Sequence, residues 1–133
     1  MTTKPTKPSV TVLHQSDTDS QLSLEIPADL FYFQGHFPEQ PILAGVVQLD
    51  WVIHYARLYL GFEQLEPNEQ LEPNKQFVVT SVEVLKFQQV ILPGMTIILQ
   101  LCKKDHNKFT FSYTSCSQDG EQHNHASGRI KVG

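Results

Sequence analysis

The chain has 133 residues, a length that favours one domain, and 40% of them are apolar, which is enough for a hydrophobic core. Its formal net charge of -4 argues against broad electrostatic binding to nucleic acid. Two cysteines, Cys102 and Cys116, are too few for a disulfide framework, and the first residues form no apolar targeting segment. We therefore expect a reduced, cytoplasmic protein that neither inserts into membranes nor binds nucleic acid.

The amino-terminal part of the chain is predicted to form a tail followed by a β-hairpin. Residues 1–9 are polar and contain two prolines, so we expect a loose tail before a single domain at 10–133. Residues 10–14 are typical of a short strand. Residues 22–26 alternate between apolar and polar side chains, which predicts a second strand paired with the first.

A nearly continuous apolar run, Ile42–Phe62, predicts the central helix of the protein. Polar residues interrupt the run too often for a membrane span. A helix that is apolar on almost all sides is expected to be buried, and this one carries the acid Asp50. Burying an unpartnered acid costs several kcal/mol or forces it to take up a proton, so catalysis is the leading explanation. Helical spacing places Asp50, His54 and Arg57 on one face.

The segment after this helix is an internal duplication, in which Glu63–Asn68 is repeated at once as Glu69–Asn74. Two copies of six residues are too few for a repeat architecture. Their acidity and prolines are typical of a solvated connector on the surface, and a partner contact is the alternative.

The remainder of the chain is predicted to be β-structure, with strands over residues 77–87, 96–103, 109–114 and 123–132. Pro93-Gly94 and Asp119-Gly120 are turn signals between these strands. The most economical architecture is α+β, with a curved antiparallel sheet wrapped around one long buried helix.

One stretch is specific enough to indicate a family. It contains Gly35-His36-Phe37-Pro38, then Pro41, Gly45-Val46, and Asp50 fourteen positions after the histidine. This pattern resembles the hot-dog-fold 3-hydroxyacyl-[acyl-carrier-protein] dehydratases of the FabA/FabZ type. The downstream Leu85-Lys86-Phe87 and Pro93-Gly94 are similar to the next block of that family. The resemblance runs from about residue 26 to about residue 96.

The resemblance implies a hot-dog fold and a homodimer, with further assembly of dimers left open. It implies an active site at the subunit interface, where His36 comes from one chain and Asp50 from the other. It also implies that the substrate is carried on the phosphopantetheine of acyl carrier protein, and that no cofactor takes part.

Removal of water from a 3-hydroxyacyl thioester requires a base, an acid and a donor to the thioester oxygen. Histidine suits the first role, so we expect His36 to take the C2 proton. A carboxyl in an apolar tunnel can stay protonated, so we expect Asp50 to assist departure of the hydroxyl. The backbone N–H of Gly45, helped by that of Val46, is expected to donate to the thioester oxygen. Two bulky side chains are expected to line the acyl tunnel, namely Phe37 and Trp51.

Several positions depart from the family pattern, among them Glu39 where glycine is common, Ala44 where proline is usual, His54 where glutamine is usual, and Met95 where aspartate is usual. The bulky Trp51 also stands where small residues are common. These departures resemble a divergent branch that includes dehydratases encoded with aryl-polyene or other specialised lipid pathways (ApeI-like). His54 or Arg57 either orients Asp50 or holds it ionised, and the second possibility would weaken an acid role.

Two other functions stay open on the same fold. An acyl thioesterase would use the acid to activate water, although thioester hydrolysis does not need the loop histidine. A non-catalytic protein that binds acyl chains is the second alternative.

Two further groups of residues have both a functional and a structural interpretation. His123 and His125 face one side of a predicted strand, but no further Cys/His spacing supports a metal, so we expect none. Six basic residues either form a surface for the carrier protein or are ordinary solvated strand positions: Lys86, Lys103, Lys104, Lys108, Arg129 and Lys131.

Overall fold

The computed structural model describes residues 6–30, 42–60, 79–105, 107–117 and 119–132. It contains β1 (Ser9–Gln15), β2 (Asp19–Glu25), α1 (Gly45–Tyr59), β3 (Val79–Phe87), β4 (Thr96–Asp105), β5 (Lys108–Cys116) and β6 (Gln122–Val132). All six strands agree with those expected from the sequence. The helix is shorter than the apolar run Ile42–Phe62, because the backbone is extended at Ala44 before it and at Leu60 after it.

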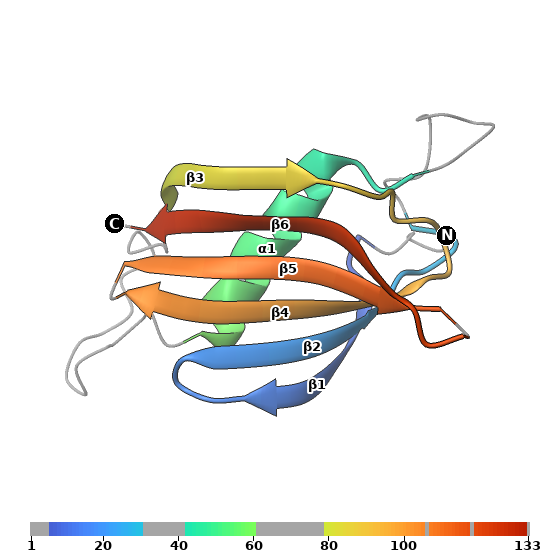
Figure 1. Cartoon of the computed structure of the whole chain (residues 1–133), viewed down its shortest axis with the longest axis horizontal. Helices are drawn as coiled ribbons and strands as arrows, with labels where there is room; N and C mark the ends of the chain where they lie inside the picture. The colour runs from blue at the N-terminus through green and yellow to red at the C-terminus, as the bar shows by residue number, and fades with distance from the viewer. Residues whose placement is uncertain (1–5, 31–41, 61–78, 106, 118, 133) are drawn as a thin grey trace, which may run out of the picture.

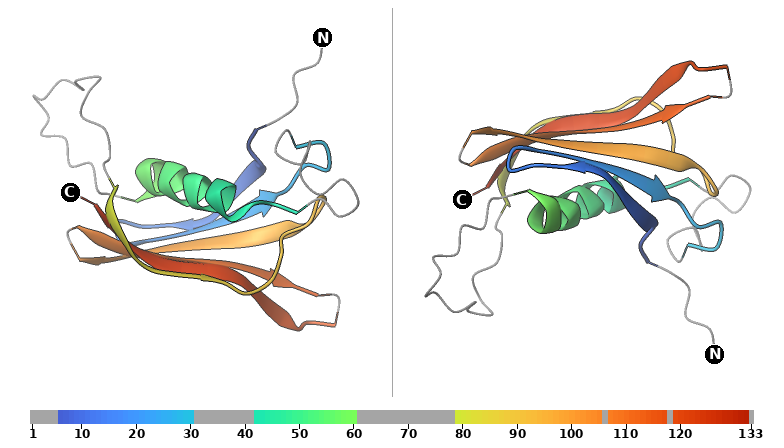
Figure 2. Two further views of the ribbon diagram at one scale, coloured as in Figure 1. Left: turned by 90° about the horizontal axis from the view of Figure 1, so that it is seen from above. Right: turned by 90° about the horizontal axis from the view of Figure 1, so that it is seen from below.

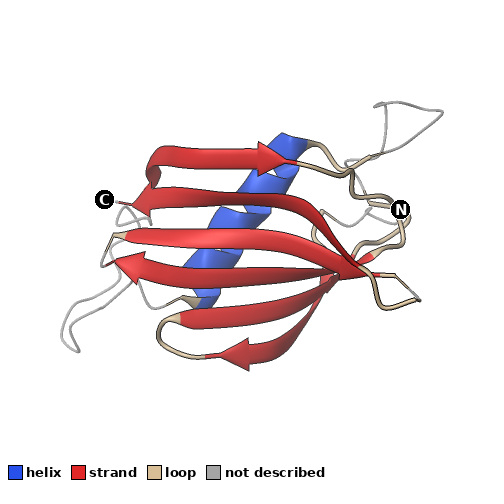
Figure 3. Cartoon of the chain, viewed as in Figure 1, coloured by secondary structure: helices blue, strands red, loops and turns tan. Residues whose placement is uncertain are grey.

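The strands form one antiparallel sheet in the order β1-β2-β4-β5-β6-β3 (Figures 1 and 3). The expected hairpin between the first two strands is confirmed by their antiparallel pairing. Both turn signals are confirmed as well, since Gly94 and Gly120 have φ values of 81° and 85°, which favour glycine.

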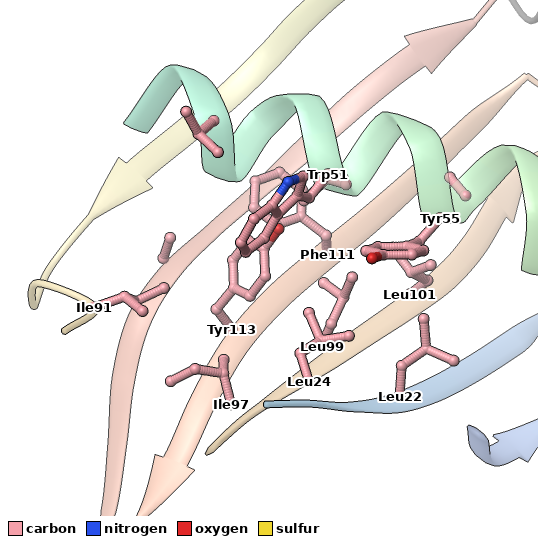
Figure 4. Packing of buried hydrophobic residues seen from close by; sticks show 14 of the residues in the cluster. Leu22, Leu24, Trp51, Tyr55, Ile91, Ile97, Leu99, Leu101, Phe111 and Tyr113 are labelled. Atoms are coloured by element: carbon pink, nitrogen blue, oxygen red, sulfur yellow. The ribbon is translucent and has the colours of Figure 1, made fainter. Parts of the chain in front are cut away.

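The helix lies across one face of the curved sheet (Figure 2). Alternate residues of the central strands point to that face and are buried, such as Leu99 on β4 and Phe111 on β5. Figure 4 shows Trp51 and Tyr55 descending from the helix into this layer of side chains. The arrangement is the α+β hot-dog fold that the sequence resemblance implies. Among the described residues, no helix is long and apolar enough to cross a membrane.

The edge strand β3 carries several exposed apolar side chains: Val82, Leu85 and Phe87. It approaches β6 closely at Gly128, where an added β-carbon would lie 2.5 Å from the Val84 carbonyl oxygen. Glycine is therefore required there by the close approach of backbone to backbone. This approach positions the end of β3, and with it Phe87, beside the start of α1.

The last residues of the expected tail contact the domain. Ser9 already belongs to β1, and Pro8 is buried. The indole Nε1 of Trp51 donates a hydrogen bond to the Thr6 carbonyl oxygen at 3.3 Å. Residues 6–8 therefore pass alongside α1, and residues 1–5 lie outside the described part of the chain.

Candidate active site

A pocket of ≈ 380 Å³ opens at the amino-terminal end of α1. Its walls are Ile42, Leu43, Ala44, Gly45, Gln48, Phe87, Gln88, Gln89 and Val90. The two wall segments are far apart in sequence, and the Leu43 N–H donates to the Ile91 carbonyl oxygen at 2.8 Å to hold them together. Because most of the lining atoms are apolar, the pocket suits an acyl chain with a few polar groups.

Gly45 stands at the first helical position and lines this pocket. A β-carbon on Gly45 would lie 2.8 Å from Cζ of Phe87, so the glycine allows the aromatic ring to sit against the helix start. The first N–H groups of a helix have no acceptor within the helix, and the helix dipole favours negative charge there. Ala44 provides no side-chain cap for this first turn. The side chain of Val46 points outward and is 75% exposed.

Gln48, one turn further along α1, is a site residue that the sequence analysis did not single out. Its side chain is 4% exposed and lines the same pocket. Its Nε2 donates to the Leu43 carbonyl oxygen at 3.0 Å, whereas its Oε1 is buried and has no partner among the described residues. Its backbone oxygen accepts a 2.6 Å hydrogen bond from the Tyr113 hydroxyl, which burial keeps protonated by raising the pKa of Tyr113 well above its usual value. The sequence feature that could have indicated Gln48 is a long polar side chain on the face of the helix that packs in the core.

Asp50 does not lie where the sequence analysis expected it. Its side chain is 65% exposed, and its Oδ2 lies 3.9 Å from Nζ of Lys7. The expectation of burial was wrong for the single chain, because only one face of α1 packs against the sheet. The face that carries Asp50 points away from the sheet, and the amino-terminal segment supplies a cation, Lys7, close to its carboxylate.

His54 lies half-buried on the same outer face of the helix. Burial lowers the pKa of its imidazole, the charges of Lys7 and Arg57 lower it further, and the charge of Asp50 opposes them. The predicted common face is confirmed by the helix itself, which contains Asp50, His54 and Arg57 at spacings of four and three residues.

Several expected site residues are placed elsewhere or not described. His36, Phe37, Glu39 and the duplicated segment 63–74 lie outside the described residues. Trp51, expected to line the acyl tunnel, is fully buried in the core and is not a wall of this pocket. Met95 has a local role, because its Sδ accepts the Leu92 N–H at 3.2 Å in the turn before β4.

A second pocket, of ≈ 370 Å³, shares Gln89 and Val90 with the first and contains His123 and His125 in its lining. An irregularity in the β5–β6 register pairs Tyr113 with Ala126 and Thr114 with Asn124, so His125 is the extra residue of a bulge. The bulge turns its ring inward, where Nε2 lies 2.7 Å from Ser115 Oγ and Nδ1 lies 3.0 Å from the Val90 carbonyl oxygen. Among the described residues, no three His, Cys, Asp or Glu side chains gather as a metal site would require.

Part of the expected basic surface is engaged within the sheet. Glu83 on β3 is 3.0 Å from Nζ of Lys108 and 3.7 Å from Nε of Arg129. The hydrogen bond from Lys108 lowers the pKa of the Glu83 carboxyl. Lys86, in contrast, is exposed and adjoins Phe87 at the pocket.

Comparison with solved structures finds relatives that match nearly all of this chain. It matches a structure described as the dehydratase heterocomplex ApeI:P from Xenorhabdus doucetiae, with 29% identity, a TM-score of 0.73, and coverage of 95% of this chain and 97% of that one. It also matches an uncharacterised protein from Erwinia carotovora subsp. atroseptica, with 36% identity, a TM-score of 0.73, and coverage of 98% and 97%.

Comparison with curated sequences gives a shorter match. A 3-hydroxyacyl-[acyl-carrier-protein] dehydratase FabZ from Burkholderia cenocepacia (strain HI2424) is 33% identical over 70 residues, which are 53% of this chain and 43% of that protein. The chain thus spans less than half the length of this curated relative. The family profile described as ApeI dehydratase matches residues 12–129, nearly the whole domain. Together with the fold and the pocket at the helix start, this match shows that the chain belongs to the ApeI-like dehydratase family.

Proposed function

We propose that this protein removes water from (3R)-3-hydroxyacyl thioesters to give trans-2-enoyl thioesters, without a cofactor. The observation that carries this proposal is the uncapped start of α1, where Gly45 faces a largely apolar pocket. An amide at a helix start is suited to a carbonyl oxygen that gains negative charge in the transition state. Membership of a dehydratase family supports the same reaction.

In the proposed reaction, His36 takes the proton from C2 as general base. The electrons of that C–H bond form the double bond between C2 and C3, and the C3–O bond breaks. Asp50 gives its proton to the leaving hydroxyl, which departs as water. The Gly45 amide, with Val46 as a second donor, stabilises the charge that develops on the thioester oxygen.

We further propose that the working unit is a dimer joined through β3. This strand is a sheet edge with exposed apolar side chains, which is the kind of edge that pairs with another chain. Pairing along β3 would bring a second subunit against the outer face of α1 and would shelter Asp50. The relative from Xenorhabdus doucetiae is described as a heterocomplex, so the second subunit is either a copy of this chain or a related protein.

We propose acyl carrier protein as the partner that delivers the substrate. The curated relative is named for a substrate on that carrier. Lys86 is an exposed cation on β3, one residue before Phe87 of the pocket lining and on the opposite face of the strand, and a cation can attract an acidic carrier. Replacing Lys86 by Glu is the direct test of this contact.

The reaction is tested in the reverse direction. The protein is mixed with trans-2-enoyl thioesters on acyl carrier protein, including aryl-ended ones, and the loss of enoyl absorbance is followed beside a thiol reagent. Loss of the enoyl signal without free thiol, absent in His36→Ala, would establish the dehydratase. Release of free thiol would instead indicate a thioesterase, and no change with any substrate would indicate a non-catalytic acyl-binding protein.

A further inference from the structure

The side-chain amide of Gln48 is oriented by its own hydrogen bond. The Leu43 carbonyl oxygen can only accept, so the atom of Gln48 that faces it at 3.0 Å must be the amide nitrogen. The amide oxygen is therefore directed away from Leu43. It is buried, and no described residue donates to it.

An unsatisfied buried acceptor is costly, by about 1 to 3 kcal/mol, and native proteins rarely leave one without a reason. Gln48 lines the same pocket as Gly45, so a ligand in the pocket can reach both residues. Side chains three residues apart on a helix share one face, and the rise between them is about 4.5 Å. A ligand carbonyl at the Gly45 amide therefore places the next few atoms of the acyl chain near the Gln48 side chain.

We propose that Gln48 Oε1 accepts a hydrogen bond from the 3-hydroxyl group of the acyl substrate, and that Gln48 thereby determines specificity for hydroxyacyl over unsubstituted acyl chains. This inference rests on the substrate class of the proposed function. A hydroxyl has one donor and two acceptor sites, so donation to Gln48 leaves its lone pairs available to the acid. A neutral amide cannot remove the proton, so Gln48 orients the hydroxyl and does not activate it.

The test is a binding measurement on the whole chain in a His36→Ala background, where the proposed base is missing and turnover does not consume the ligand. The probes are a 3-hydroxyacyl pantetheine thioester and the saturated acyl pantetheine thioester of the same length. Gln48→Leu keeps the approximate size of the side chain and removes the acceptor. We expect it to weaken hydroxyacyl binding about tenfold relative to saturated acyl binding, the loss of one hydrogen bond.

Tyr113→Phe is the matched control. It removes the 2.6 Å hydrogen bond to the backbone oxygen of the same residue without touching the side-chain amide. We expect it to lower stability and to leave the preference for hydroxyacyl ligands unchanged. Equal weakening of both probes by Gln48→Leu would overturn the inference, because it would assign the donor to the shared pantetheine arm. An unchanged preference would overturn it as well.

This result is independent of the hydration assay. A chain that binds hydroxyacyl ligands through Gln48 but does not turn over would refute the proposed reaction and support the role of Gln48. A chain that turns over but shows no change of preference in Gln48→Leu would support the reaction and refute that role.

Discussion

At the residue scale, Asp50 has a side chain suited to acid catalysis but does not, in the single chain, lie in the buried environment that such a role requires. The carboxyl group has the chemistry of a general acid, but in the single chain it is exposed and 3.9 Å from Lys7. We expect Asp50→Asn to reduce turnover by about 10² to 10⁴, the usual contribution of general acid–base catalysis. The rate is measured by enoyl hydration, with circular dichroism to verify the fold. An unchanged rate would transfer the acid role to another group or to water.

Gly45 is required by the approach of its neighbour, because an added β-carbon would meet the tip of the Phe87 ring at 2.8 Å. Phe87 is half-exposed, so its ring can move aside, and alanine is a better helix former than glycine by up to about 1 kcal/mol. We therefore expect Gly45→Ala to keep its melting temperature. We expect turnover to fall about 10²-fold, because the methyl group and the displaced ring disturb substrate placement. Full activity would show that the substrate does not pass this position.

His54 predicts a pH dependence of stability. Its pKa is lowered in the folded chain, first by burial and then by Lys7 and Arg57, although Asp50 opposes the effect. The unfolded chain therefore binds the proton more readily, so stability is greatest above the ordinary histidine pKa of about 6.5 and falls as the pH drops below it. We expect His54→Gln to reduce this fall. Melting temperatures of both proteins at about pH 5 and about pH 8 provide the comparison, and an equal fall in both would contradict the assignment.

At the element scale, the attachment of β3 to β6 controls one wall of the pocket. A β-carbon at Gly128 would lie 2.5 Å from the Val84 carbonyl oxygen and 2.7 Å from the Phe111 ring. Neither the backbone of a paired strand nor a buried ring can move away without a cost in stability. We expect Gly128→Ala to lower the free energy of unfolding by about 1 to 3 kcal/mol. It should also loosen Phe87 and reduce turnover. Ser127→Ala, one residue away, is the control in denaturant unfolding, and equal effects of the two changes would contradict this explanation.

A second element, the bulge on β6, holds the neighbouring part of the pocket wall, residues 88–90, by hydrogen bonds. The His125 ring bonds the Val90 carbonyl oxygen, and the His125 carbonyl oxygen accepts from the N–H groups of Gln88 and Gln89. The segment 88–90 is thus held on three bonds by one residue of β6. Because this segment also lines the pocket beside Gly45, the bulge gives the wall a defined position.

At the scale of the whole molecule, the two sheet edges differ in what they contribute to the site. We expect Leu85→Lys on β3 to dissociate the proposed dimer and abolish turnover, because an edge lysine discourages pairing of strands. The same change at the exposed Leu13 on β1, at the opposite edge of the sheet, should leave the oligomeric state and the turnover rate unchanged. Analytical ultracentrifugation and the hydration assay measure the two outcomes. Dissociation by Leu13→Lys alone would place the interface on β1.

Much of the fold was predictable because its signals are local. Period-two alternation such as that of residues 22–26 indicates a strand, and glycine at positions 94 and 120 indicates a turn wherever the rest of the chain goes. The family pattern at Gly45 and Asp50 was equally readable. The extent of the helix was overestimated, because the backbone is extended at Ala44 and Leu60 although their side chains are apolar.

The sequence by itself determined the strands, the turns, the helix and the chemical types available for catalysis, because each depends on neighbouring residues. Only the tertiary structure decided that Asp50 faces outward, that Trp51 belongs to the core, and that the Gln48 amide oxygen is buried without a partner among the described residues. These facts depend on which face of α1 meets the sheet and on how β3 and the segment 88–90 pack against the start of the helix. Such contacts join residues that are distant in sequence, so no local pattern specifies them.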